Sequence, residues 1–290
     1  MERCGKQENT MKNSGLNADK TEAREFQTPS SGIFFKADRV LCEKTTAFQR
    51  VEIIDNAAFG RVLLLDGLVQ TTEMDEFNYH EMLVHPACSS HPAPRNVLVI
   101  GGGDGGALGE VLKHAVEKAV LVEIDSGVIE ACREFFPWLE PALKDSRSEL
   151  VIGDGNAFVR DTDLRFDAVL VDSSDPVGPS TVLHDEGFYA GLKRILNPGG
   201  VIAAQAGSPV LHLDALTAKS LFLKRLFKYS RYYLGPVPTY PVGTWCYHFL
   251  SDAFDPLDGR DLRIPAGLKY YNAEIHTAAF ALPNYLRCLA

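Results

Sequence analysis

Acidic side chains follow four successive apolar segments of this 290-residue chain. They are Asp104, Glu123 with Asp125, Asp154, and Asp172 with Asp175. If the apolar segments are parallel strands, their carboxyl ends meet at one edge of a sheet and the acids line a single cleft. A cleft lined by carboxylates attracts cations and repels phosphate groups. The spacing therefore predicts a binding site for a cationic ligand.

A glycine-rich turn carries the first of these acids. The segment reads VLVIGGGDGG, and its Gly101, Gly103 and Gly106 satisfy the G-x-G-x-x-G pattern of nucleotide-binding turns. Glycine allows the backbone to turn tightly and to approach a ligand closely. The pattern alone occurs in enzymes that use nicotinamide, flavin or S-adenosylmethionine, and a tight strand–helix turn without a ligand also satisfies it.

Two further acids strengthen the nucleotide interpretation. Glu123 ends the next strand, twenty positions after Gly103, where a carboxylate accepts hydrogen bonds from ribose hydroxyls. Asp125 competes for that role, and a solvent-exposed strand end is the alternative for Glu123. Asp154 follows the third strand, where a carboxylate accepts a hydrogen bond from an adenine amino group.

Asp104 distinguishes between the ligands that the glycine turn admits. Its charge would repel the pyrophosphate of a dinucleotide, and it would oppose the carboxylate of intact S-adenosylmethionine. Decarboxylated S-adenosylmethionine carries only cationic groups, a sulfonium and an ammonium. On electrostatic grounds the sequence favours the decarboxylated molecule, which is a substrate, and no separate cofactor is expected.

The elements that would position these acids alternate between strand and helix from residue 96 onward. The expected strands cover 96–100, 119–124, 149–152, 167–171 and 201–205. The expected helices cover 106–114, 127–136, 156–160, 185–196 and 213–227. Five such repeats predict an α/β fold with a Rossmann-like, S-adenosylmethionine-type doubly wound sheet, which binds ligands beyond the carboxyl ends of its strands.

Three regions follow from these patterns. Residues 1–31 are polar and are predicted to form a flexible tail. Residues 32–74 are predicted to form a small N-terminal antiparallel β-domain, in which Asp66-Gly67 makes a hairpin turn. Residues 75–290 would form the Rossmann-like catalytic domain. It would also contain a first helix over 75–88 and a last helix over 273–282. A closing antiparallel pair of strands is expected over 232–238 and 244–251.

Composition and charge exclude several classes of protein. Hydrophobic residues make up 46% of the chain, but no run of 18 apolar residues predicts a transmembrane helix. A net charge of −9 disfavours nucleic acid and anionic membranes as partners. The six scattered cysteines and the lack of a secretory signal are typical of reduced thiols in the cytoplasm. His80 and His85 lie five residues apart, not the four of a zinc-protease helix, so no metal site is expected.

Seven segments together resemble one known family. They read, in order, LLLDGLVQTTEMDEFNYHEMLVHP, VLVIGGGDGGALGEVLKH, VLVEID, GDG, VDSSDPVGP, PTYPVG and KYYNAEIHTAAFALPNYLR. In these motifs and in their order the chain resembles the spermidine synthase family of polyamine aminopropyltransferases. The resemblance spans residues 32–287 and implies an N-terminal β-domain, a Rossmann-like domain, and assembly as a homodimer or homotetramer.

The resemblance also implies roles for individual residues. The donor would be bound by Gln49, Gly101, Gly103, Asp104, Glu123, Asp154, Gly155 and Pro179. The acceptor would be bound by Tyr79, His80, Asp104, Asp172, Asp175 and Tyr240. Asp104 would hold the aminopropyl amine of the donor, and Asp172 would be the general base. An acceptor amine is protonated at neutral pH, so the base must remove a proton before the nitrogen attacks the carbon beside the sulfonium.

The implied function is transfer of an aminopropyl group to putrescine, which gives spermidine and methylthioadenosine. Cadaverine, agmatine and spermidine are alternative acceptors. A small-molecule methyltransferase that uses intact S-adenosylmethionine has the same fold, and a catalytically silent polyamine-binding protein is an alternative of another class.

Two departures from the family concern the amine acceptor. Many members have Trp after the glycine of the first β-segment, where this chain has Ile33, and Glu two residues after Gln205, where this chain has Gly207. Without that glutamate the distal ammonium would be held loosely, and we expect putrescine to be preferred while a longer amine is also used. The alternative is a carboxylate supplied from elsewhere in the fold.

Overall fold

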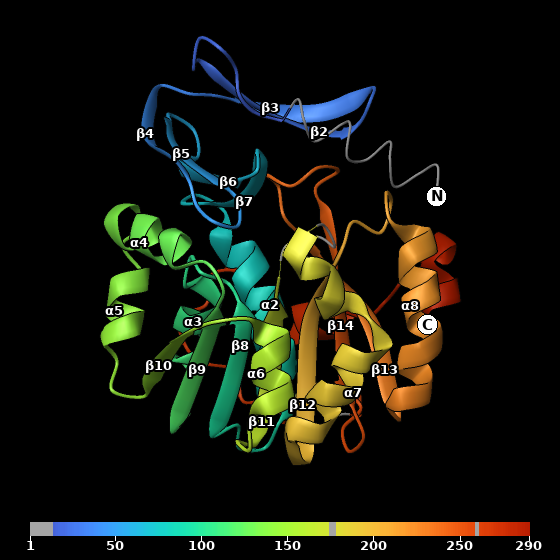
Figure 1. Cartoon of the computed structure of the whole chain (residues 1–290). Coiled ribbons are helices and arrows are strands. Elements are labelled where there is room, and N and C mark those ends of the chain that lie inside the picture. Colours follow the sequence, from blue (N-terminus) through green and yellow to red (C-terminus); the bar gives the residue numbers. More distant parts are fainter. Residues whose placement is uncertain (1–13, 174–177, 259–260) are drawn as a thin grey trace.

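The computed structural model describes residues 14–173, 178–258 and 261–290. Its described strands form three sheets, and the small N-terminal sheets lie over one end of the large C-terminal sheet (Figure 1). The predicted α/β fold, a doubly wound sheet with small N-terminal antiparallel sheets, is confirmed. The domain boundaries expected at residues 31 and 74 stay predictions.

The large sheet has seven described strands, in the order β10-β9-β8-β11-β12-β14-β13. Five are parallel: β8 (Asn96–Gly101), β9 (Lys118–Glu123), β10 (Ser148–Ile152), β11 (Phe166–Asp172) and β12 (Leu196–Gly207). Two antiparallel strands follow at one edge, β14 (Thr244–Ser251) and β13 (Tyr229–Pro236). The strand order reverses at β8, which lies between β9 and β11, and doubly wound sheets bind their ligands at such a point.

Helices cover both faces of the large sheet, which is why its central strands are continuous apolar runs. One face carries α2 (Glu76–Ser90), α3 (Gly106–Val111) and α9 (Ala273–Ala279). The other carries α6 (Gly155–Asp161), α7 (Glu186–Ile195) and α8 (Leu213–Leu226). The sequence did not predict α5 (Leu139–Lys144) or the 3-10 helices Gly178–His184 and Asn284–Leu289. Among the described residues, no helix is both long enough and apolar enough to cross a membrane.

Two small antiparallel sheets precede the large one. The first contains β1 (Gly15–Leu16), β2 (Glu22–Thr28) and β3 (Ser31–Lys36). The second contains β4 (Arg39–Thr45), β5 (Arg50–Asn56), β6 (Gly60–Leu65) and β7 (Leu68–Thr72). The second sheet packs on α4 (Ser126–Phe135) through an apolar cluster of Val51, Ile53 and Leu63 with Val128 and Cys132.

The structure differs from the flexible tail expected over residues 1–31. Residues 14–31 include β1 and β2, whereas residues 1–13 lie outside the described residues. On β2, Ala23 and Glu25 are buried while Arg24 between them is exposed, which is the alternation of a half-buried strand. Polar composition hid this strand, because one of its two buried side chains is a glutamate.

Helix α2 joins two distant motifs of the sequence. The buried carboxylate of Glu81 accepts hydrogen bonds from the backbone N–H groups of Lys269, Tyr270 and Tyr271, at 2.8, 2.8 and 2.7 Å. The segment before α9 is thereby tied to the helix that carries Tyr79. This contact explains in physical terms why the DEFNYHE and KYYNAE segments belong together.

Candidate active site

A cavity of about 300 Å³ lies where the N-terminal strands meet the carboxyl ends of β8, β9 and β11. Gln49, between β4 and β5, and Leu63 of β6 line it on one side, and the glycine turn after β8 lines it on the other. This position, beyond the strand ends at the reversal of strand order, is where doubly wound sheets bind ligands. We therefore identify this cavity as the candidate active site.

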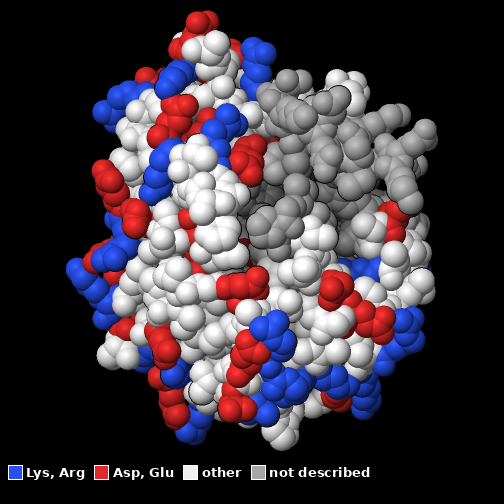
Figure 2. Space-filling model, in the orientation of Figure 1, with Lys and Arg blue, Asp and Glu red and all other residues white. Residues whose placement is uncertain are grey.

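Negative charge is concentrated in the cavity. Among the described residues, no Lys, Arg or His lines it, whereas six carboxylates do: Glu25, Asp66, Asp104, Glu123, Asp154 and Asp172. On the molecular face shown in Figure 2, acidic and basic side chains are instead interspersed. A cavity of this charge attracts cations, and its described side chains offer no positive partner to the carboxylate of intact S-adenosylmethionine.

Asp172, at the end of β11, lines the cavity beside Tyr79 of α2. Tyr79 Oη donates a hydrogen bond of 2.6 Å to Asp172 Oδ1. Burial raises the pKa of Asp172 to about 6, and the charge of Asp104 adds to the increase, whereas His80 and the Tyr79 hydrogen bond oppose it. A carboxylate whose pKa lies near the operating pH is suited to general-base catalysis.

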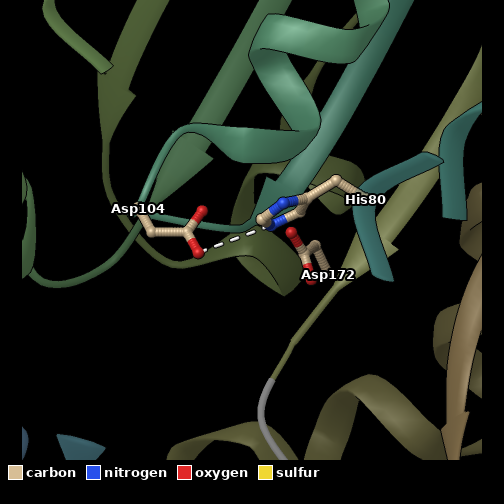
Figure 3. Close-up of side chains that lie close together, drawn as sticks. All are labelled: His80, Asp104 and Asp172. Carbon is tan, nitrogen blue, oxygen red and sulfur yellow. Dashed lines mark ion pairs between the residues drawn. The ribbon is translucent and has the colours of Figure 1, made fainter. Parts of the chain in front are cut away.

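His80, the next residue of α2, forms an ion pair with Asp104 (Figure 3). His80 Nε2 lies 3.4 Å from Asp104 Oδ2, and His80 Nδ1 lies 2.8 Å from Glu76 Oε2. Burial lowers the pKa of His80, but Asp104 and Glu76 outweigh burial and hold that pKa well above its ordinary value. The protonated form of His80 is therefore favoured beside Asp104. His80 is not among the described residues that line the cavity, and its predicted contact with the acceptor stays a prediction.

The same cluster also has the spacing of a metal site. His80, Asp104 and Asp172 each bring one ligand atom within 4.8 Å of the others. A metal needs a lone pair on the imidazole, whereas the raised pKa of His80 favours its protonated form. The arrangement fits an organic ammonium better than a metal ion, and the expected absence of a metal stays a prediction.

Glu123 and Asp125 are the two carboxylates that the sequence offered for binding ribose hydroxyls, and the structure gives them different surroundings. Asp125 Oδ1 accepts from Gly127 N at 2.9 Å and caps α4, and Asp125 Oδ2 accepts from Thr46 and Gln49 at 2.7 and 3.0 Å. Glu123 lines the cavity and Asp125 does not. Burial raises the pKa of Glu123 to about 7. Glu123 is therefore placed to meet a ligand, whereas Asp125 holds the neighbouring structure, including Gln49.

Two glycines of the turn allow the backbone to approach these carboxylates. At Gly101, whose φ is +80°, a Cβ atom would lie 2.2 Å from the backbone oxygen of Asp172. At Gly103, a Cβ atom would lie 3.0 Å from Glu123 Oε2. Larger residues at either position would displace the strand end or the carboxylate beside it.

The structure describes only some of the remaining residues that were predicted to bind the substrates. Asp154 and Gly155 both line the cavity. Asp154 is exposed at its edge, and its Oδ1 accepts from Ala157 N at 2.9 Å and caps α6. Asp175 lies outside the described residues, and only the backbone of Pro179 is described, within the 3-10 helix Gly178–His184.

Aromatic rings line the side of the cavity next to Asp172. The ring centroids of Tyr79 and Tyr240 lie 5.7 Å apart, and those of Tyr240 and Trp245 lie 4.7 Å apart. Tyr240 Oη donates a hydrogen bond of 2.5 Å to the backbone oxygen of Gln70 on β7. Such rings can hold a methylene chain and also attract a nearby ammonium.

The structure does not bring Ile33 or Gly207 to the described cavity wall. Ile33 pairs with Glu25 across β2 and β3 and packs against the core of the N-terminal sheets. Gly207 lies at a bulge of β12 with φ +88°, where a Cβ atom would meet His212. The expectation that these two positions loosen the acceptor site stays a prediction.

Several cavity residues, among them Gln205, Trp245, Glu25 and Gln70, were not predicted as site residues. Gln205 Nε2 donates to Ser173 O at 2.7 Å, and Trp245 Nε1 donates to Gln205 Oε1 at 3.1 Å. Gln205 ends a predicted strand, as the acids do, and this signal was available from the sequence. Glu25 and Gln70 gave no such signal, because the first fell in the predicted tail and the second in a hairpin strand.

Comparisons with known proteins identify the family of this chain. A family model described as the spermine/spermidine synthase domain matches residues 76–257, and one described as the spermidine synthase tetramerisation domain matches residues 23–73. A polyamine aminopropyltransferase of Bacillus mycoides is 42% identical over 264 residues, which cover 90% of this chain and 96% of the relative. One from Caldicellulosiruptor bescii is 43% identical over 265 residues, which cover 91% of this chain and 95% of the relative.

Solved structures show the same likeness. A crystal structure of spermidine synthase in complex with the transition state analogue AdoDATO has a TM-score of 0.86 at 41% identity, and the match covers 90% of this chain and 91% of that one. The spermidine synthase of Thermotoga maritima has a TM-score of 0.84 at 41% identity, and 90% of each chain is covered. At this identity and coverage the likeness concerns the sequence as well as the fold.

Proposed function

Since the chain belongs to the spermine/spermidine synthase family and is a polyamine aminopropyltransferase, we propose that its donor is decarboxylated S-adenosylmethionine and its acceptor putrescine. The products would be spermidine and methylthioadenosine. The observation that carries this proposal is a cavity lined by six carboxylates and, among the described residues, by no cationic side chain. Both substrates are cations, and neither has a carboxylate.

On the donor side, the proposal assigns the ribose hydroxyls to Glu123 and the adenine amino group to Asp154. Gln49, Gly155 and Pro179 would contact the rest of the nucleoside. The cavity wall supports this assignment, because it includes Glu123, Asp154, Gln49 and Gly155. Asp104 would bind the primary ammonium of the donor, because its ion pair with His80 keeps the pKa of Asp104 below its ordinary value despite burial.

On the acceptor side, Asp172 would bind one ammonium of the diamine and take a proton from it. The neutral nitrogen then attacks the carbon beside the sulfonium, a C–N bond forms, and the C–S bond breaks. The electron pair of that bond stays on sulfur, which leaves as a neutral thioether, so no acid is needed for the leaving group. Tyr79 orients Asp172, and the rings of Tyr79 and Tyr240 hold the methylene chain for in-line attack.

The size of the cavity supports a short acceptor. This cavity, at about 300 Å³, lies at the lower end of the roughly 300–1,000 Å³ that ligand sites span. Putrescine is shorter than cadaverine, agmatine or spermidine. We also propose assembly as a homodimer or homotetramer, which the match of residues 23–73 to a tetramerisation domain supports.

The experiment is a comparison of kcat/KM for the four amines with decarboxylated S-adenosylmethionine as donor. Putrescine is expected to have the highest value. A higher value for another amine would refute putrescine as the acceptor while leaving aminopropyl transfer intact. Absence of transfer to every amine by the folded protein would refute the reaction itself.

A further inference from the structure

Asp75, the residue before α2, is a buried carboxylate whose side chain does not cap its own helix. An aspartate at this position usually accepts a hydrogen bond from a backbone N–H of the first helical turn. With the described residues of that turn, the Asp75 side chain makes no such bond. It is 5% exposed and is not among the described residues that line the cavity. Because a buried carboxylate is costly unless its oxygens are bonded, the bonds that it makes instead indicate what it stabilises.

The Asp75 carboxylate joins two segments that are distant in the sequence. Its Oδ1 accepts a hydrogen bond of 2.7 Å from Thr72 Oγ1, at the end of β7. Its Oδ2 accepts two from Thr239, one from the backbone N at 2.9 Å and one from Oγ1 at 2.7 Å. Thr239 lies in the loop between β13 and β14, 164 residues from Asp75 in the sequence. Both threonines are buried, and hydrogen bonds that a carboxylate accepts are stronger than those between neutral groups.

The segments that meet at Asp75 carry the two tyrosine rings of the acceptor side. Tyr240 follows Thr239 directly. Tyr79 lies four residues after Asp75, about one helical turn along α2. The ring centroids of Tyr79 and Tyr240 are 5.7 Å apart, and both rings line the cavity. The Tyr240 hydroxyl is also held by β7, because it donates to the backbone oxygen of Gln70.

We propose that Asp75 is a positioning residue for the amine acceptor, because it fixes the Tyr240 ring relative to the Tyr79 ring. The inference rests on the proposed function, in which these two rings hold the methylene chain of the acceptor. Asp75 acts through Thr239 and does not touch the reacting atoms. Its role is therefore separate from deprotonation by Asp172.

The test compares amine use with donor binding in Asp75→Ala, which removes all three hydrogen bonds of the carboxylate. The Tyr240 ring can then shift, while Glu123 and Asp154 keep their places on the donor side. The kcat/KM for putrescine should fall by about 10- to 100-fold, since a misplacement of about 1 Å costs up to about 10²-fold. The affinity for decarboxylated S-adenosylmethionine, measured by calorimetric titration without amine, should stay within about threefold, because the donor does not share these contacts.

Asp75→Asn is the conservative variant that should restore activity. Its amide oxygen can accept from Thr239, and its Nδ2 can donate to Thr72 Oγ1, whose hydroxyl also accepts. Asp75→Asn should therefore recover most of the kcat/KM for putrescine that Asp75→Ala loses. Equal losses in the two variants would show that the charge matters and not the hydrogen bonds, and would overturn the positioning role.

A matched control is Glu81→Ala on the same helix. Glu81 is 1% exposed, and its carboxylate also accepts three hydrogen bonds, from the backbone of residues 269–271. Neither Glu81 nor residues 269–271 are among the described residues that line the cavity. Glu81→Ala should lower the unfolding temperature but keep kcat/KM for putrescine within about threefold. The same loss of kcat/KM as in Asp75→Ala, or a donor affinity that falls as far in Asp75→Ala, would contradict the inference.

Thr239→Val keeps the test decisive if Asp75→Ala does not fold. It preserves the shape of the side chain and removes one hydrogen bond to Asp75. The kcat/KM for putrescine should fall by about three- to tenfold, as expected for one hydrogen bond, with donor affinity unchanged. An undiminished kcat/KM refutes the role of Asp75 while aminopropyl transfer stands. Absence of transfer to every amine by folded wild-type protein refutes the proposed function instead.

Discussion

The Asp172→Asn variant is predicted to lose activity and gain stability at once. The amide keeps the size of the side chain and an oxygen for the hydrogen bond from Tyr79, but it cannot accept a proton from the amine. Loss of a general base lowers turnover by about 10²–10⁴-fold. The same substitution removes a carboxylate whose ionised form is disfavoured in the folded protein.

The gain in stability follows from the pKa of this carboxyl group. Burial raises the pKa of Asp172 from 3.8 to about 6, so the folded state holds a proton that the unfolded state has already released between these pH values. The free energy of unfolding therefore decreases as pH rises from about 4 to about 6, and the decrease is complete above that range. At about 1.4 kcal/mol per pH unit of pKa difference, ionisation costs up to about 3 kcal/mol at pH 8.

The assay measures the thermal unfolding of wild type and Asp172→Asn at equal protein concentration, at pH 8 and at pH 4.5. Turnover of both proteins is measured at pH 8. The variant should melt several degrees above wild type at pH 8, and the difference should shrink at pH 4.5. Asp167→Asn is the control, since Asp167 lies at the other end of β11 and accepts from Arg95 N and Asn96 N, both at 2.9 Å. It should not raise stability and should retain turnover. An Asp172→Asn protein that is less stable than wild type at pH 8, or that turns over normally, would refute the reasoning.

Three further predictions concern donor choice, the pH profile and the glycine turn. Asp104→Asn should weaken binding of decarboxylated S-adenosylmethionine and so reduce the ratio of its affinity to that of S-adenosylmethionine. Calorimetric titration that gives an unchanged affinity ratio would contradict this. In wild type, kcat/KM should decrease as pH falls through about 6, because Asp172 becomes protonated. The hydrogen bond from Tyr79 lowers the pKa of Asp172, so its loss in Tyr79→Phe should raise that pKa and shift this limb of the pH profile to higher pH. A limb at the same pH in Tyr79→Phe would show that another group titrates. Gly101→Ala should lower kcat/KM by at least about tenfold, since the added Cβ would clash with the backbone oxygen of Asp172. Near-normal turnover would show that β11 can shift without disturbing the site.

Much of the donor side was predictable from the sequence because each acid ends its own strand. A parallel sheet aligns strand ends, so Asp104, Glu123, Asp154 and Asp172 had to meet once the strand–helix alternation was recognised. The choice between Glu123 and Asp125 was not predictable, since it depends on Thr46 and Gln49, which approach from a different sheet.

The acceptor side depended on contacts that no local pattern reveals. His80 follows Tyr79 directly, but helical geometry points the two side chains in different directions, and the His80 ring lies against Asp104. Glu25 lines the cavity from β2, and its carboxylate accepts a hydrogen bond from the backbone N–H of Val69 on β7, which lies 44 residues away in the sequence. In a polar segment, the burial of one glutamate cannot be read from composition, because it is caused by strand pairing and not by apolar residues.

The most direct measurement is mass spectrometry of the products that wild-type protein forms from putrescine with decarboxylated S-adenosylmethionine, and in parallel with S-adenosylmethionine. Aminopropyl transfer predicts spermidine and methylthioadenosine in equal amounts from the decarboxylated donor, and little or no product from the intact one. Methylated putrescine from S-adenosylmethionine, or no product from either donor with folded protein, would contradict the function that the carboxylate-lined cavity supports.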